Sequence, residues 1–167
     1  PPCSDDFDVT PLGIPPTPWS AVSGPNATVA VVDGTSVGRS GRCVRLWDPS
    51  LTSYCRLGYT SPPMEKVYFK GYYRFGDATQ KHFLFLGNGN EGTLYLLTAY
   101  NKKCHDASDT PLPAPDFVSG QWYKIELLVD FPSRTYAVWM DDRQIGFNLQ
   151  IPSNTFITGF RIQPGTE

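Results

Sequence analysis

The chain has 167 residues, a length typical of one domain with a substantial hydrophobic core. Its formal net charge is -2 and it has no run of basic residues, which argues against nucleic acid as a partner. No apolar stretch is long enough to span a bilayer, so we expect no membrane insertion. We therefore expect residues 1–167 to form a single domain.

The composition predicts strands rather than helices. Glycine and proline interrupt a sequence rich in aromatic and β-branched residues, as in short strands joined by turns. No long window has helical spacing without a proline or glycine, so the expected class is all-β. In chain order, the expected strands cover residues 28–33, 43–46, 54–57, 66–75, 81–86, 93–100, 122–131, 135–141, 144–150 and 158–163. So many antiparallel strands need two sheets, which predicts an antiparallel two-sheet β-sandwich or jelly roll.

Two of these segments form the clearest pattern of the chain. From Tyr123 to Phe131, apolar and polar residues alternate, and only Leu128 breaks the polar set. The alternation resumes from Thr135 to Met140, after a Pro-Ser turn. The pair predicts an antiparallel hairpin with one buried face and one face in water.

Residues 102–119 are expected to form an ordered loop. Pro111, Pro113 and Pro115 interrupt this segment, and proline is not tolerated in a central strand. Cys104 is expected to hold the start of the loop in place.

Four cysteines are consistent with an exported protein. Cys43 and Cys55 flank a turn-like segment, so they would face each other across a hairpin and form a disulfide. Cys3 and Cys104 would then form the second disulfide. Four cysteines allow three pairings, and the sequence excludes neither the other two nor four free thiols in a cytosolic domain.

Other features also favour a secreted or cell-surface protein. Asn26 begins an Asn-Ala-Thr sequence, which is a glycosylation acceptor on exposed loops. The chain begins Pro1-Pro2-Cys3 without an initiator methionine or a signal peptide, as expected of a mature or trimmed fragment.

Several segments together resemble those of a known superfamily. Asp6-Phe7-Asp8, Gly13 and Trp19 come first, followed by GRCVRL at 41–46 and VYFKGYYRF at 67–75. The similarity is strongest in GQWYKIEL, residues 120–127, and VWMDDR, residues 138–143. On these segments the chain resembles the concanavalin A-like jelly rolls, which include legume lectins, laminin G-like domains, glucanases and several polysaccharide lyases. The resemblance implies a glycan on a concave sheet and, as in several members, a structural calcium ion.

The first candidate ligand-binding residues are those of the predicted strand 66–75 that would face the solvent. Two tyrosines and two cations share this face, namely Tyr68, Lys70, Tyr72 and Arg74. Aromatic rings stack on sugars, and charged donors bond to their oxygens. With residues from neighbouring segments, the candidate set is Tyr72, Arg74, His82, Tyr100, Lys124, Glu126 and Trp139. The alternative is an ordinary solvated face with scattered ion pairs. Both phases of residues 81–86 are largely apolar, so the sequence does not decide which of them is buried.

A catalytic alternative rests on Gln80-Lys81-His82, which resembles the Gln-x-His element of some jelly-roll polysaccharide lyases. The resemblance implies β-elimination, in which Arg74 or Gln80 neutralises a uronate carboxylate and His82 acts as the base. Tyr72 or Tyr100 would be the acid. The dispersed glutamates argue against the paired-carboxylate mechanism of glucanases.

Asp5 and Asp6, followed by Asp8, offer the oxygen ligands that a structural calcium ion prefers, and ordinary surface acids are the alternative. No other cofactor is indicated. We expect an extracellular carbohydrate-binding, lectin-like module whose partner is a polysaccharide or glycan. The alternatives are a uronate polysaccharide lyase and a non-catalytic structural or adhesion domain of a surface assembly. The sequence does not indicate an oligomeric state.

Overall fold

The computed structural model describes residues 6–49, 55–87, 94–152 and 156–164. The strands of these residues are β1 (Ser20–Ser23), β2 (Thr28–Asp33), β3 (Arg42–Trp47), β4 (Cys55–Met64), β5 (Lys66–Arg74), β6 (His82–Gly87), β7 (Leu94–Tyr100), β8 (Lys103–His105), β9 (Trp122–Asp130), β10 (Thr135–Met140), β11 (Arg143–Gln150) and β12 (Ile157–Pro164). Their helical structure is a 3₁₀ turn, η1 (Gly34–Val37), and none of it could cross a membrane. The all-β prediction is confirmed.

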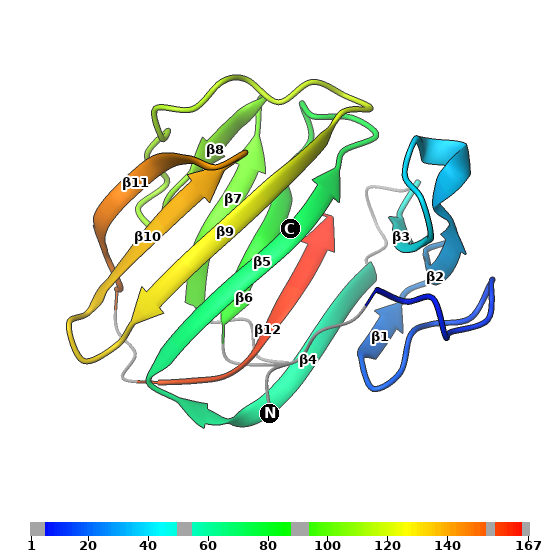
Figure 1. Cartoon of the computed structure of the whole chain (residues 1–167), viewed down its shortest axis with the longest axis horizontal. Helices are drawn as coiled ribbons and strands as arrows, with labels where there is room; N and C mark the ends of the chain where they lie inside the picture. Colours follow the sequence, from blue (N-terminus) through cyan, green and yellow to red (C-terminus); the bar gives the residue numbers. More distant parts are fainter. Residues whose placement is uncertain (1–5, 50–54, 88–93, 153–155, 165–167) are drawn as a thin grey trace.

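The strands form two main antiparallel sheets that pack face to face (Figure 1). The six-stranded sheet has the order β1-β4-β12-β6-β7-β8, and the four-stranded sheet has the order β11-β10-β9-β5. Strands β2 and β3 form a small third sheet, which lies beside β1 in Figure 1. The prediction of an antiparallel two-sheet sandwich is therefore confirmed.

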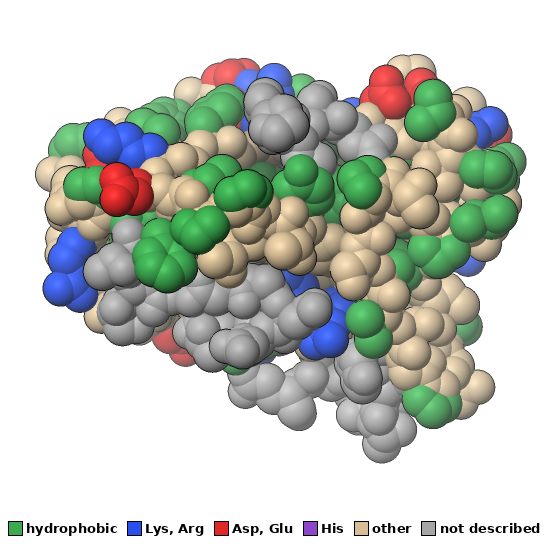
Figure 2. Space-filling model, turned by 90° about the horizontal axis from the view of Figure 1, so that it is seen from below, with side chains coloured by type: hydrophobic (Ala, Val, Ile, Leu, Met, Phe, Trp, Pro, Cys, Tyr) green, Lys and Arg blue, Asp and Glu red, His purple; other side chains and the backbone are tan. Residues whose placement is uncertain are grey.

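The core lies between the two main sheets. Ile125 and Leu127 of β9 are completely buried, and Phe85 of β6 is completely buried opposite them. Full burial of such a side chain contributes about 1.5–3 kcal/mol. Phe160 of β12 joins the layers, because its ring centroid lies 4.9 Å from that of Phe69 in β5 and 5.7 Å from that of Phe85. Figure 2 views the lower end of the molecule, where hydrophobic side chains form a band among small groups of charged ones.

The predicted hairpin of β9 and β10 is confirmed. Trp139 lies opposite Glu126, and Met140 lies opposite Ile125. The apolar phase of both strands is buried, whereas Leu128 on the other face is 48% exposed. The hairpin thus has the two distinct faces that its alternation predicts.

The predicted ordered loop of residues 102–119 is largely correct, although its start forms the short strand β8. The backbone N–H of Phe117 donates to the carbonyl of Lys102 at 2.7 Å, and that of Leu112 donates to the carbonyl of Cys104 at 2.8 Å. Cys104 is 1% exposed, so the loop is anchored by burial and backbone bonds. The strands β1 and β8 were missed because three or four residues are too few for a recognisable alternation.

The predicted disulfide between Cys43 and Cys55 is wrong, since both are free thiols. The prediction assumed that β3 and β4 form a hairpin, but β3 pairs with β2, and β4 pairs with β1 and β12. Cys104 is also a free thiol, contrary to the predicted pairing with Cys3, which lies outside the described residues. Burial raises the pKa of the Cys55 and Cys104 thiols to about 12.

Candidate functional site

The outer face of the four-stranded sheet carries most of the predicted ligand-binding side chains. In β5, Tyr73 is buried in the core, so its neighbours in the strand point outward. In β9, Ile125 and Leu127 are buried, and their neighbours Lys124 and Glu126 point outward. The β5 residues of this face are Tyr68, Lys70, Tyr72 and Arg74.

Strand pairing places these side chains in rows. Glu126 lies opposite Lys70 of β5 on one side and Trp139 of β10 on the other. In the next row, Tyr72 lies opposite Lys124. Opposed residues of an antiparallel pair have Cβ atoms about 4.5–5.5 Å apart, so aromatic and charged groups alternate at contact range across the sheet.

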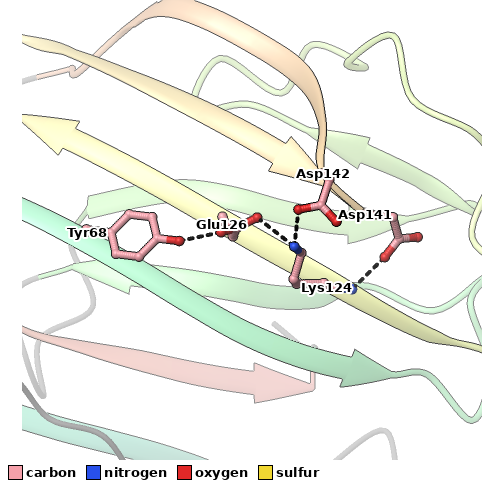
Figure 3. A network of polar contacts seen from close by, with 5 residues as sticks. All are labelled: Tyr68, Lys124, Glu126, Asp141 and Asp142. Atoms are coloured by element: carbon pink, nitrogen blue, oxygen red, sulfur yellow. Dashed lines mark hydrogen bonds and ion pairs between the residues drawn. The ribbon is translucent and has the colours of Figure 1, made fainter.

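A chain of polar contacts crosses this face (Figure 3). The Tyr68 hydroxyl donates to Glu126 Oε1, and Lys124 Nζ lies 3.3 Å from Glu126 Oε2. Lys124 also pairs with Asp142 in the β10–β11 turn, and its backbone N–H donates to Asp141 Oδ1 at 2.8 Å. The side chains of Lys124 and Glu126 are 16% and 15% exposed, so neighbouring groups hold them in fixed positions.

These contacts keep the groups in their ordinary charge states at neutral pH. The hydrogen bond from Tyr68 lowers the pKa of Glu126, and the same bond raises the pKa of Tyr68. The hydrogen bond to Asp142 raises the pKa of Lys124. Each shift moves the pKa of the group further from pH 7, whereas a general acid or base works best with a pKa near the working pH. The arrangement therefore suits recognition by hydrogen bonds better than proton transfer.

A pocket of about 300 Å³ opens beside the network and is called here the Tyr68 pocket. Its lining residues are Tyr68, Glu126, Leu128, Trp139 and Asp142. Tyr68 is 60% exposed, so its ring is available to a ligand. The pocket combines aromatic and apolar surface with carboxylate acceptors, as small-molecule sites commonly do.

Arg39 extends this aromatic surface, and sequence reasoning missed it. Its guanidinium carbon lies 4.4 Å from the ring centroid of Tyr72 and 5.2 Å from that of Trp122. The indole N–H of Trp122 donates to the carbonyl of Val37 at 2.8 Å, which ties the end of η1 to β9. No local pattern links residue 39 to these rings, because the contact joins distant parts of the chain.

The candidate residues that share the outer face of the four-stranded sheet are Tyr72, Arg74, Lys124, Glu126 and Trp139. Tyr72 is 47% exposed and lies beside Lys70, whose Nζ is 5.8 Å from the ring centroid. Arg74 donates from Nε to the carbonyl of Gly120 at 2.9 Å. This bond directs Arg74 to the turn before β9.

His82 and Tyr100 belong to the six-stranded sheet. The His82 ring packs against the core residue Phe75 at 4.9 Å, and its Nε2 lies 2.9 Å from the Asp77 carbonyl oxygen. Burial lowers the pKa of His82. Tyr100 stacks on His105, with ring centroids 4.0 Å apart.

The residues named for the lyase alternative therefore lie in two places. Gln80 and His82 both contact Asp77 in the segment between β5 and β6. Tyr72 and Arg74 point outward from the other sheet. The structure does not bring His82 and Tyr72 onto one surface.

Asp6, proposed as a calcium ligand, accepts a hydrogen bond from the backbone N–H of Asp8 at 3.1 Å. The carboxylate of Asp8 in turn accepts the backbone N–H of Arg42 at 2.7 Å. Within the described residues, no group of three His, Cys, Asp or Glu side chains could hold a metal ion. Asp5 lies outside the described residues, so the calcium site stays a prediction. Glycosylation of Asn26, which is exposed, also stays a prediction.

No protein-family model and no curated protein matches the chain. Among solved structures, a sialidase is similar in fold with a TM-score of 0.71 and 14% identity, over 89% of this chain and 13% of that chain. This chain thus spans only a small part of the length of that sialidase. The carbohydrate esterase of the Shiga toxin-encoding bacteriophage phi24B has a TM-score of 0.51 and 15% identity, over 89% of this chain and 90% of that chain. At such identities the similarity is one of fold.

Proposed function

We propose that the chain is an extracellular carbohydrate-binding, lectin-like module that holds a polysaccharide or glycan on the outer face of the four-stranded sheet. The observation that carries the proposal is the Tyr68 pocket. Exposed aromatic surface lies there beside acidic side chains, and Glu126 is already fixed by hydrogen bonds. The proposed relationship to the concanavalin A-like proteins agrees with such a site.

The chemistry of a sugar matches the pocket. The C–H face of a pyranose ring would pack on Tyr68 or Trp139, and its hydroxyl groups would donate to Glu126 or Asp142. Because Tyr68 and Lys124 hold Glu126 in place, little side-chain entropy is lost on binding. The ordinary charge states of these groups favour binding without catalysis.

The structural comparisons support a carbohydrate ligand in a general way. The two similar structures carry names that refer to carbohydrate chemistry, a sialidase and a carbohydrate esterase. A sandwich that recurs in such proteins is a suitable scaffold for a glycan-binding face. The secreted or cell-surface location is part of the same proposal.

A glycan array followed by isothermal titration calorimetry tests the proposal. Tyr68→Ala and Trp139→Ala should each weaken the binding of the selected glycan by about 1 kcal/mol, a factor of roughly five in Kd, because a stacking partner is lost. Phe147→Ala is the matched control, since Phe147 is 68% exposed and does not line the Tyr68 pocket. Its affinity should equal that of the wild type.

Two results would reject the proposal. One is the absence of binding to every neutral and acidic glycan tested. The other is an equal loss of affinity in Phe147→Ala and Tyr68→Ala. Light scattering that shows self-association without glycan binding would instead support the structural or adhesion alternative.

A further inference from the structure

A second pocket opens at the end of the four-stranded sheet where β9 begins and β10 ends. Its volume of about 400 Å³ lies within the range of roughly 300–1,000 Å³ that is typical of small-molecule sites. Its lining residues differ from those of the Tyr68 pocket. The polar ones are Asp116, Gln121, Asp141 and Arg143, and the apolar ones include Val118 and Met140. This second pocket is called here the Arg143 pocket.

Hydrogen bonds and packing hold the walls of the Arg143 pocket in place. The Tyr123 hydroxyl accepts the backbone N–H of Val118 at 2.6 Å, which fixes the segment before β9 to the strand. Tyr123 and Met140 are both 3% exposed, so this side of the pocket belongs to the packed core. Asp116 forms an ion pair with Lys103 of β8. A ligand would therefore find the walls largely preformed, and little ordering would oppose its binding.

The charges of the Arg143 pocket balance. Asp116 is paired with Lys103, and Asp141 lines the same pocket as the Arg143 guanidinium. An anionic ligand would face both carboxylates, whereas a cationic ligand would face the guanidinium. The Tyr68 pocket also disfavours an anion, because two carboxylates line it. An uncharged ligand therefore suits both pockets.

The polar groups of the Arg143 pocket are available to the hydroxyl groups of such a ligand. Among the described residues, the side chains of Gln121 and Arg143 take part in no hydrogen bond or ion pair. The carboxylate of Asp141 accepts a backbone bond through Oδ1, which leaves Oδ2 for a ligand. A sugar hydroxyl can donate to a carboxylate and accept from a guanidinium at the same time. Val118, which is 55% exposed, offers an apolar wall to the C–H groups of the sugar.

The two pockets lie on either side of the β10–β11 turn. Asp141 lines the Arg143 pocket, and the next residue, Asp142, lines the Tyr68 pocket. Consecutive Cα atoms are about 3.8 Å apart, so the pockets are neighbours. Lys124 holds both carboxylates, since its backbone N–H donates to Asp141 and its ammonium group pairs with Asp142 (Figure 3). The backbone N–H of Asp141 also donates to the Lys124 carbonyl at 2.9 Å, which fixes the turn between the pockets.

We propose that the Arg143 pocket is a second subsite for the same glycan, so that an extended, uncharged oligosaccharide crosses the β10–β11 turn and occupies both pockets. This inference rests on the proposed function, because the Tyr68 pocket holds the first part of the ligand. Once one part is bound, the next sugars reach the Arg143 pocket at a high effective concentration. The ligand class is therefore a neutral polysaccharide chain rather than a single terminal sugar or an acidic glycan.

Calorimetric titration with oligosaccharides of two lengths tests the proposal. The probes are cello-, xylo-, manno- and malto-oligosaccharides, each as the disaccharide and the hexasaccharide, with a galacturonate hexamer as the acidic counterpart. At least one neutral hexasaccharide should bind about tenfold or more tightly than its disaccharide, because only the longer probe reaches both pockets. The galacturonate hexamer should bind more weakly than that neutral hexasaccharide.

Variants of the Arg143 pocket separate its contribution from that of the Tyr68 pocket. Arg143→Ala and Gln121→Ala should each weaken the hexasaccharide by about fivefold, since a hydrogen bond to the ligand is lost. Both residues are exposed, so the unfolding temperature should not change. The disaccharide should keep its affinity in Arg143→Ala, because the Tyr68 pocket can hold it alone. Arg45→Ala removes the same charge from an exposed position of β3 and should leave both probes unaffected.

Three outcomes would overturn the proposal. In the first, no neutral hexasaccharide binds more tightly than its disaccharide. In the second, the galacturonate hexamer binds more tightly than every neutral probe. In the third, Arg143→Ala and Gln121→Ala both keep the wild-type affinity for the hexasaccharide. If Tyr68→Ala still weakens glycan binding in any of these cases, the proposed function stands without the second subsite; if no glycan binds at all, both fail.

Discussion

Gly159 allows the sharpest test of the packing within the six-stranded sheet. It lies in β12 with a φ of +153°, where L side chains are rarely found. A Cβ atom at this position would lie 2.1 Å from the carbonyl oxygen of Tyr59 and 3.1 Å from the Cα of Thr60. Both are backbone atoms of the paired strand β4, so neither can rotate away.

Two effects set the magnitude expected for Gly159→Ala. A strained backbone conformation destabilises by about 1–3 kcal/mol. Forcing an extra methyl group into a packed site destabilises by about 1–3 kcal/mol more. The expected total of about 2–6 kcal/mol is a large part of the roughly 5–15 kcal/mol that stabilises a typical domain. Urea unfolding should therefore show a much lower midpoint, or the variant should fail to fold.

Gly58→Ala is the control in the neighbouring strand. A Cβ at Gly58 would lie 3.7 Å from the carbonyl oxygen of Phe160 and 3.8 Å from that of Ser20, which is ordinary contact. Its stability should stay within about 1 kcal/mol of the wild type. If both variants unfold at the same urea concentration, the backbone clash at Gly159 is absent and the reasoning is refuted.

Three further predictions concern buried and paired groups. Tyr136→Phe should lose about 1 kcal/mol of unfolding free energy in urea, because the Tyr136 hydroxyl accepts the Ala107 N–H at 2.8 Å; an unchanged midpoint would contradict this. The Tyr68 hydrogen bond lowers the pKa of Glu126, so the ionised Glu126 carboxylate stabilises the folded state. This stabilisation is complete above the unfolded pKa of about 4.3 and disappears as the pH falls through the folded pKa. In Glu126→Gln the urea midpoint of unfolding should depend less on pH in this acidic range. An unaltered pH profile would disprove the assignment. Cys55 and Cys104 should resist iodoacetamide until denaturant is added, whereas a disulfide seen by mass spectrometry would refute free thiols.

The sequence predicted the strands well where one face is buried and the other is wet. The bounds of β2 were predicted without error, and those of β9 and β10 within one residue. Strand partners were harder, because pairing depends on contacts between distant parts of the chain. The disulfide between Cys43 and Cys55 failed for this reason: each cysteine lies in a predicted strand, but the two strands are not neighbours.

The candidate site shows the same division. Alternation placed Tyr72, Lys124 and Trp139 on one outer face, and the strand pairing agrees. Arg39 could not be predicted, because its position depends on how the segment after η1 folds over β9. The phase of His82 was undecided, since residues 81–86 are apolar on both faces and the pairing of β6 with β7 shifts register between Phe83 and Phe85.

The position of β12 has a consequence for the order of events during synthesis. This strand follows all the other described strands in the chain, yet it pairs with β4 on one side and β6 on the other. Until residues 157–164 have left the ribosome, β1 and β4 cannot join β6, β7 and β8 in one sheet. During that interval β4 and β6 would expose unpaired edges, which are sites of aggregation in incomplete β proteins. A chain truncated before residue 157 should therefore be sensitive to protease, whereas the 167-residue chain should be resistant.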